Sequence, residues 1–299
     1  MQIFITGASG YIGGSVAAAL LASGHRIVGL VRSEQRASQV RDRGIEPALG
    51  TLSDLEVLAA ASRQADAVIN TANADDRPSV EAMLAAIKGT GKAFIQTSGS
   101  SIVADLAGGE PTDAVYEDHT PLHPLPGRVG RVAINDLVLS AAKEGVRAVV
   151  IAPTLIYGRG SGVNPHSIQV PKMTALAKKY GIAKHIGRGE NIWSNVHIDD
   201  MVDLYLRVLD RAPAGAFYYA ENGENSMREV NAAISRALGF GGRTESMSIP
   251  EAAAEWGDAA ANYSFGSNSR VRATRARREL GWAPSRGTLL EDIARARGS

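Results

Sequence analysis

The chain of 299 residues contains no cysteine, only 5% aromatic residues and no clear excess of either charge, with 32 lysines and arginines against 31 aspartates and glutamates. Without cysteine it can form no disulfide, thiolate nucleophile, iron–sulfur cluster or cysteine-ligated zinc site. The balanced charge gives no reason to expect a nucleic-acid partner. Its chemistry must therefore come from oxygen and nitrogen groups or from a cofactor.

Long hydrophobic runs are also missing, because no uninterrupted apolar stretch approaches the roughly 18 residues of a membrane span. The opening MQIFITGASG reaches a strand pattern and a glycine turn too early for a signal peptide. We therefore expect a cytoplasmic protein without a membrane partner. The six histidines are scattered and none has HExxH spacing, so we also expect no metal site.

The first half of the chain alternates short β-branched runs with longer helical patterns, which is typical of βαβ units feeding a parallel sheet. The predicted strands are Gln2–Thr6, Arg26–Val31, Glu46–Ala48, Ala67–Asn70, Ala93–Thr97 and Ala148–Ala152. The predicted helices are Tyr11–Ser23, Ser53–Ser62, Ser79–Lys88 and Arg131–Glu144. Most of these strands are apolar on both faces, as covered strands should be. The sequence predicts an α/β fold with a doubly wound, Rossmann-type parallel sheet over residues 1–158.

After residue 158 the pattern changes to isolated helices joined by loops rich in glycine, asparagine and serine. The predicted helices are Pro171–Lys179, Met201–Asp210, Met227–Leu238 and Ala273–Leu280. We expect residues 159–299 to form mainly a smaller, substrate-binding C-terminal region, with 193–215 returning to the first domain. Residues 105–130 are predicted to be irregular, and a loop of that length is usually functional or mobile.

The strongest local motif is TGASGYIG, in which Gly7, Gly10 and Gly13 lie between the first strand and its following helix. Glycines at this spacing permit a tight turn, close approach of the backbone to a pyrophosphate and close helix–sheet packing. The context predicts a dinucleotide site rather than a purely structural turn. The other residues of the turn assigned to the cofactor are Ser9, Tyr11 and Ile12.

The second strand ends in GLVRS, where an NAD-binding fold would carry an acidic residue for the ribose 2′-hydroxyl. Arg32 and Ser33 stand there instead, and Arg36 lies one helical turn further on. A guanidinium beside a hydroxyl can bind a 2′-phosphate, which a carboxylate would repel. The motif favours NADP (NADPH) over NAD, the alternative being an exposed surface arginine.

Several further motifs occur in order along nearly the whole chain. They are GTLSD (50–54), DAVINTAN (66–73), FIQTSGSS (94–101), APTLIYGRG (152–160), WSNVHIDDMVDLY (193–205) and RRELGWAP (277–284). Together with the glycine turn, they make the chain resemble the extended and atypical short-chain dehydrogenase/reductase superfamily, in its NAD-dependent epimerase/dehydratase-like branch. The resemblance implies a nicotinamide cofactor, a small-molecule substrate and a possible homodimer.

The resemblance also implies roles for individual residues. Thr51 and Leu52 should lie near the adenine. The residues expected to line the cofactor groove after the fourth strand are Thr71, Ala72 and Asn73, and those bordering the nicotinamide and the substrate cleft are Pro153, Thr154, Ile156 and Tyr157. For His197, substrate contact and a packed structural histidine are equally open.

The chain departs from the family at its reactive pair, a tyrosine followed four residues later by a lysine. The alignment puts Gly127 at the tyrosine position and Arg131 at the lysine position. Arg131 could still bind the nicotinamide ribose, but it cannot easily release a proton. The family's catalytic Ser or Thr aligns with Gly99, so the candidate hydroxyls are Ser98, Ser100 and Ser101.

A replacement proton donor must then come from elsewhere in the chain. Histidine and tyrosine are the residue types that suit this task. The candidates are Tyr116, His119, His123, Tyr157, His197 and a water held by Ser98 or Ser100. Three functions follow from these observations. The first is an NADPH-dependent reductase acting on a carbonyl or related group of a small organic substrate. The second is a non-catalytic NADP(H) sensor or regulatory protein, and the third is a sugar-nucleotide epimerase or dehydratase.

Overall fold

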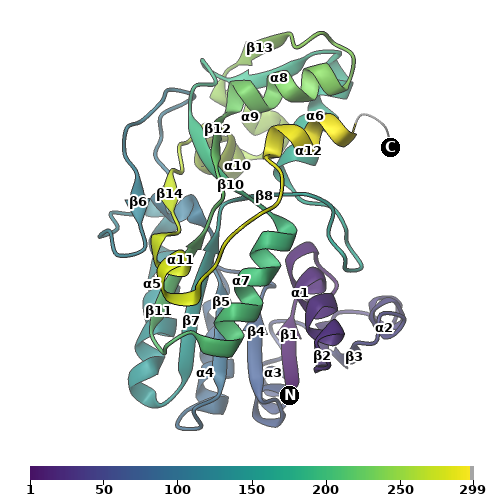
Figure 1. Cartoon of the computed structure of the whole chain (residues 1–299), viewed down its shortest axis with the longest axis vertical. Coiled ribbons are helices and arrows are strands. Elements are labelled where there is room, and N and C mark those ends of the chain that lie inside the picture. The colour runs from purple at the N-terminus through teal and green to yellow at the C-terminus, as the bar shows by residue number, and fades with distance from the viewer. Residues whose placement is uncertain (297–299) are drawn as a thin grey trace.

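A seven-stranded parallel sheet forms the centre of the protein (Figure 1). The computed structural model describes residues 1–296. The strands follow the order β11-β7-β5-β4-β1-β2-β3. Their bounds are β1 Gln2–Thr6, β2 Arg26–Val31, β3 Glu46–Leu49, β4 Ala67–Asn70, β5 Ala93–Thr97, β7 Arg147–Pro153 and β11 Ala216–Ala220. Strands β1, β2 and β3 follow one another toward one edge of the sheet, and β4 then pairs with the other side of β1. This change of strand order places a crevice at the carboxyl ends of β1 and β4.

Helices cover both faces of this sheet. They are α1 Tyr11–Ala22, α2 Glu34–Arg41, α3 Leu55–Gln64, α4 Arg77–Ile87, α5 Pro126–Ser140 and α7 Ile198–Arg211. Alternate residues of β1 point to opposite faces: Ile3 and Ile5 pack in one core with α1 and α7, whereas Phe4 packs in another with α3, α4 and α5. The sheet is therefore buried on both sides, as its apolar strands require.

A smaller region lies over the carboxyl end of the sheet (Figure 1). Its strands form a three-stranded sheet, β12 Glu224–Ser226, β10 Ile192–His197 and β8 Leu155–Tyr157, and two pairs, β13 Thr244–Met247 with β9 Ala183–Ile186 and β14 Val271–Arg272 with β6 Tyr116–Glu117. Its helices are α6 Gln169–Tyr180, α8 Met227–Ala237, α9 Ile249–Trp256, α10 Asp258–Ala260 and α12 Leu289–Arg295, whereas α11 Thr274–Leu280 lies beside the main sheet. Short helical turns are η1 Ser100–Val103, η2 Ala141–Glu144 and η3 Ala261–Phe265, the last a π-turn.

The predicted fold class is confirmed, and each of the six predicted strands is present. The prediction omits helix α2 and strand β11, and it is also wrong about the region before α5. The helix expected to begin at Arg131 begins at Pro126, because proline is well suited to the first turn of a helix. The irregular stretch expected over 105–130 therefore ends earlier, and it also contains β6.

Segments from the second half of the chain return to the main sheet. After β10, helix α7 packs on α1, and β11 then pairs with β7 as the edge strand. Helix α11 packs on β11 and α7. Among the helices of residues 1–296, none combines the length and the hydropathy needed to cross a membrane.

Candidate active site

The glycine turn between β1 and α1 has no room for a side chain at Gly7 or Gly13. Gly7 has a φ of 74°, in the left-handed region, and its carbonyl accepts a hydrogen bond from the Gly10 N–H at 2.8 Å. A Cβ atom on Gly13 would lie 2.3 Å from Thr71 Oγ1 and 2.5 Å from the Gly7 carbonyl oxygen. The N-cap residue Gly10 offers no side chain to the free N–H groups of the first turn of α1. Those donors are open to an anion.

The remaining residues of the turn have different surroundings. Ser9 and Ile12 are half-buried, and Tyr11 is buried. The Tyr11 hydroxyl donates to the carbonyl oxygens of Tyr157 and Gly158, at 3.0 and 2.8 Å, and burial raises its pKa. The Tyr11 side chain thus ties α1 to the loop after β8, and only its backbone faces the turn.

Two segments meet at the carboxyl ends of the neighbouring strands β2 and β3. Arg32 is exposed and its guanidinium makes no hydrogen bond or ion pair within residues 1–296. Ser33 caps α2 by accepting from the Arg36 N–H at 3.3 Å. Beside them, the Thr51 N–H and hydroxyl donate to Asp54, which lowers the pKa of that carboxyl. Leu52 is half-buried next to Thr51.

The segment after β4 forms the adjoining wall. The Thr71 hydroxyl donates to the Thr6 carbonyl at 2.7 Å, which holds the side chain against Gly7. Ala72 and Asn73 are exposed, and Asn73 Oδ1 accepts from the Asp75 N–H at 3.0 Å. The structure thus brings this segment and the glycine turn together.

Arg131 extends from α5 toward the carboxyl end of β5. Its Nε and Nη2 both donate to the carboxylate of Asp75, and its Nη1 donates to Ser101 Oγ at 3.1 Å. The same nitrogen lies 3.4 Å from the position of a Cβ on Gly99. This bidentate contact with the guanidinium lowers the pKa of Asp75. Arg131 and Asp75 therefore place an ion pair between β4 and β5, and sequence reasoning missed Asp75.

The candidate serines differ in how they are paired. Ser100 Oγ is 2.8 Å from Ser269 Oγ, and Ser101 accepts from Arg131. Ser98 is buried, and its hydroxyl has no hydrogen-bond partner in the described part of the chain. A buried hydroxyl without a partner is costly. Ser98 is thus the candidate serine whose hydroxyl is unpaired in the described structure, but its oxygen is itself buried.

Tyr157 lies in the core of the second region and not in the groove. It is 1% exposed, its hydroxyl donates to the Gly287 carbonyl at 2.7 Å, and burial raises its pKa. Its ring meets the His197 ring edge-on at 5.3 Å. His197 itself caps α7 by accepting from the Asp199 N–H at 3.1 Å. These contacts argue against proton donation by either residue, because both are already engaged in holding the fold.

The other predicted residues lie at separate places in the structure. Pro153 and Ile156 are buried at β7 and β8, and Thr154 donates to the Ala220 carbonyl at 2.9 Å. Tyr116 and His123 line a cavity of about 270 Å³ behind η1, whereas His119 borders a separate surface hollow. The structure therefore does not bring the three loop candidates to one place.

A residue that sequence reasoning missed occupies the space beside Gly127. A Cβ on Gly127 would lie 2.7 Å from the hydroxyl oxygen of Tyr263 and 2.8 Å from its Cζ. The Arg128 guanidinium lies 4.4 Å from the centre of the Tyr263 ring. No local pattern could have revealed this, because Tyr263 belongs to η3 in the second region.

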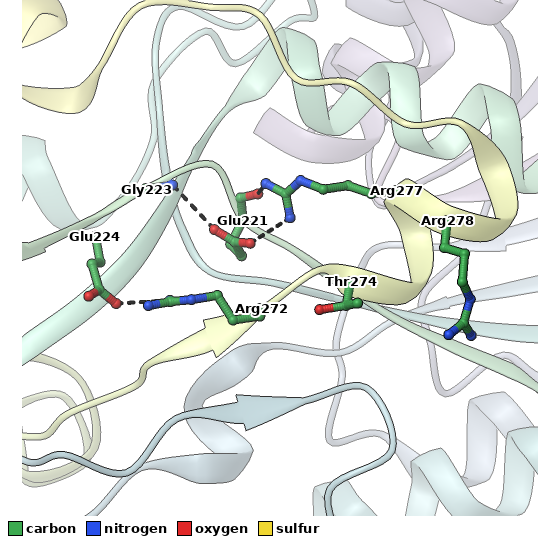
Figure 2. Close-up of a pocket in the computed structure, with 7 residues that line it drawn as sticks. All are labelled: Glu221, Gly223, Glu224, Arg272, Thr274, Arg277 and Arg278. Atoms are coloured by element: carbon green, nitrogen blue, oxygen red, sulfur yellow. Dashed lines mark hydrogen bonds and ion pairs between the residues drawn. The ribbon is translucent and has the colours of Figure 1, made fainter.

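A surface hollow lies elsewhere, beyond the edge strand β11 (Figure 2). Its volume is about 740 Å³, and we refer to it as the Glu221 hollow. It is lined by Glu221, Gly223, Glu224, Arg272, Thr274, Arg277 and Arg278. Figure 2 shows that Glu221 points toward Arg277 and Glu224 toward Arg272. Because these charges are paired with one another, the hollow is best explained as a structural ion-pair network.

The acid stability of the protein should depend on Glu224. Contacts with Arg270 and Arg272 lower the pKa of Glu224 from 4.5 to about 2. The resulting stabilisation is fully present above pH 4.5 and is lost as the pH falls through 2. We expect Glu224→Gln to lower the free energy of unfolding at pH 7 by about 2–3 kcal/mol and to flatten its decline in acid.

Urea unfolding at several pH values checks this prediction. Glu245→Gln is the matched control, because Glu245 is exposed and its carboxylate lies a long 3.7 Å from Lys184 Nζ. In the Glu245→Gln control, the free energy of unfolding should still decline as the pH falls. An unchanged decline in Glu224→Gln would contradict the prediction.

Comparison with known proteins agrees with the order of motifs and with the fold. The model of the family described as "NAD dependent epimerase/dehydratase family" matches residues 3–218. An oxidase from Acremonium sp is 30% identical, over 98% of this chain and 95% of its own. The 4-hydroxy-2-methyl-3-oxo-4-farnesyl-3,4-dihydroquinoline-1-oxide ketoreductase of Stigmatella aurantiaca is 30% identical, over 75% of this chain and 69% of its own.

A solved structure extends the likeness over the whole length. The dTDP-glucose 4,6-dehydratase of Bacillus anthracis, in complex with NAD, superposes with a TM-score of 0.77 at 18% identity, covering 100% of this chain and 96% of its own. That likeness shows the fold. With the family match over most of the chain, it establishes that this protein belongs to the NAD-dependent epimerase/dehydratase family.

Proposed function

We propose that this protein is an oxidoreductase that uses NADPH to reduce a carbonyl or related group of a small organic substrate. The observation that carries the choice of NADPH is the free guanidinium of Arg32 at the end of β2. The nearest carboxylate along the chain, that of Glu34, lies 3.8 Å from Arg41. Two relatives, an oxidase and a ketoreductase, support redox chemistry.

The groove residues fit a dinucleotide. Gly7 and Gly13, where a Cβ would meet Thr71 or the Gly7 backbone, hold the turn and α1 close to the segment after β4, and the first turn of α1 would donate its free N–H groups to the pyrophosphate. Arg131 would bind the nicotinamide ribose, and Thr51 and Leu52 would border the adenine. A bound NADPH would supply a hydride.

Arg32→Asp should separate the two cofactors. The substitution replaces a cation by an anion facing the 2′-phosphate, so we expect NADPH affinity to fall by about 100-fold and NADH affinity to change by less than about threefold. Calorimetric titration with each cofactor measures this. Arg26→Asp, at the opposite end of β2 and also exposed, is the control and should leave both affinities unchanged. Equal losses for NADPH and NADH in Arg32→Asp would contradict the assignment.

A second candidate is an NADP(H) sensor without turnover, favoured by the absence of a tyrosine at position 127. A sugar-nucleotide epimerase or dehydratase ranks lower, because the acidic residue expected after β2 for NAD is also absent. NADPH oxidation with a panel of aldehydes, ketones and β-keto esters distinguishes the three. Oxidation indicates the reductase, tight binding without oxidation indicates the sensor, and copurified NAD indicates the epimerase.

A further inference from the structure

We propose that Tyr263 is the catalytic proton donor of this site, supplied by the second region in place of the tyrosine that Gly127 lacks. The inference rests on the proposed reductase function. It adds the identity of the acid, which neither the family pattern nor the candidates from the sequence provide.

The position of the phenol is the first argument. Gly127 is in the first turn of α5, and its missing Cβ would fall 2.7 Å from the Tyr263 hydroxyl oxygen. Any side chain at this position would collide with the phenol. The glycine is therefore not simply a loss of the tyrosine, because it makes the space that a different tyrosine occupies.

The second argument is that the phenol is free to react. The Tyr263 side chain is half-buried, and its hydroxyl makes no hydrogen bond to any residue from 1 to 296. By contrast, Tyr157 donates to Gly287 and Tyr180 to Glu255. An unpaired hydroxyl on a partly exposed ring can bond to a substrate oxygen without breaking any contact of the fold.

The third argument is the cation held on the ring. Arg128 donates to the Gly127 carbonyl at 3.0 Å, and its guanidinium lies 4.4 Å from the ring centre of Tyr263. Burial lowers the pKa of Arg128, but a guanidinium still remains charged in a protein. Its Nε is buried without a partner in the described structure. Negative charge that develops on the phenol oxygen would be stabilised by this neighbour.

The segment that carries Tyr263 is held on both sides. Ala261 and Phe265, at the two ends of η3, are buried, and the Phe265 ring packs 4.1 Å from that of Trp256. The Gly266 N–H donates to the Ala261 carbonyl at 2.9 Å, and the Gly266 carbonyl accepts from the Gly109 N–H at 3.0 Å. The backbone is thus fixed, and the phenol projects across to α5 as a positioned group.

The proposed step balances with NADPH as the reductant. A hydride adds to the carbonyl carbon as the C=O π bond breaks, and Tyr263 gives its proton to the oxygen. The products are an alcohol, NADP⁺ and a Tyr263 phenolate, which regains a proton from water. In the reverse direction the same phenolate accepts the proton from the alcohol.

Tyr263→Phe tests the step directly. The hydroxyl supports no contact of the fold, so this variant should keep the wild-type melting temperature and NADPH affinity. With ethyl 2-methyl-3-oxobutanoate as the ketone probe, or the best substrate of the carbonyl panel, we expect kcat to fall by at least about 100-fold. Tyr180→Phe removes a surface hydroxyl bonded to Glu255 and should retain full activity.

Gly127→Ala provides a second variant. Its methyl group must displace the phenol, so kcat should fall while cofactor affinity is retained. Gly130→Ala is the matched control on the same helix, because a Cβ there meets nothing within 4 Å. Full activity in both Tyr263→Phe and Gly127→Ala would overturn the proposal.

A readout without turnover separates this inference from the proposed function. In protein labelled with 3-fluorotyrosine, the ¹⁹F resonance missing from Tyr263→Phe belongs to Tyr263, and it should shift when NADP⁺ binds, whereas that of Tyr180 should not. Binding of NADP⁺ with an unmoved Tyr263 resonance overturns the donor role alone. A shifted resonance without reduction of any carbonyl also overturns it and leaves a sensor, and no binding of NADP⁺ overturns the function together with the donor.

Discussion

Replacing Gly13 by alanine should lower the affinity for the nicotinamide cofactor by about 100-fold and lower the free energy of unfolding by about 2–3 kcal/mol. The new methyl carbon would lie 2.3 Å from Thr71 Oγ1 and 2.5 Å from the Gly7 carbonyl oxygen. Thr71 could rotate only by giving up its hydrogen bond to the Thr6 carbonyl, and the Gly7 oxygen is backbone. Helix α1 must therefore move away from β1 and β4, which displaces the N–H groups that would bind the pyrophosphate.

Calorimetric titration with NADPH and urea unfolding measure the two effects of Gly13→Ala. A loss of about 100-fold in affinity corresponds to about 2.7 kcal/mol. Gly130→Ala makes the same chemical change on an exposed face of α5 and should stabilise the helix by up to about 1 kcal/mol without changing affinity. Wild-type affinity in Gly13→Ala would show that the turn does not hold the cofactor.

Removing the Glu221 carboxylate should cost about 3 kcal/mol of unfolding free energy. Glu221 is 4% exposed, and it accepts hydrogen bonds from Arg277 at 2.6 Å, from the Ala273 N–H at 3.0 Å and from the Gly223 N–H at 3.3 Å. Glu221→Ala leaves the N–H of the buried Ala273 without its acceptor and Arg277 without its carboxylate. The attachment of α11 to β11 should weaken accordingly.

Chemical denaturation measures the effect of Glu221→Ala, with Glu245→Ala at an exposed carboxylate as the control, expected to cost less than about 1 kcal/mol. NADPH affinity measured below the denaturation range should be unchanged in both variants. A wild-type stability in Glu221→Ala would contradict the structural role, and a loss of cofactor affinity without unfolding would show that the Glu221 hollow takes part in binding.

The fold was predictable where local sequence and burial agree. The strands β1, β4 and β5 are mostly apolar and almost fully buried, and Gly24, Gly89 and Gly145, each after a helix, mark the starts of β2, β5 and β7. Strand β11 was missed because its AFYYA sequence lies within a stretch of helices and loops, and only its parallel pairing with β7 makes it a sheet strand. The start of α5 was placed too late because the match to the family began at Arg131, while Pro126 had been read as part of a loop.

In the candidate site, too, local motifs were predictable from the sequence and contacts between distant segments were not. The glycine turn and Arg32 can be proposed from the sequence because each is a contiguous motif with its own chemistry. The resemblance singles out Arg131 on the helix after β5, and its guanidinium lies beside Gly99 and Ser101. Asp75 could not be found, because its partner belongs to another helix. Tyr263 was equally hidden, because its role depends on the space left at Gly127 and not on any neighbour in sequence.

The late arrival of β11 in the chain has a consequence for biosynthesis. Until residues 216–220 leave the ribosome, the apolar strand β7 has an unpaired edge, and the intervening chain that builds the smaller region must be accommodated first. Exposed strand edges recruit other chains, and pairings between distant segments form slowly. A nascent chain that stalls inside the second region therefore presents β7 to its neighbours, and completion of the sheet is the event that protects it.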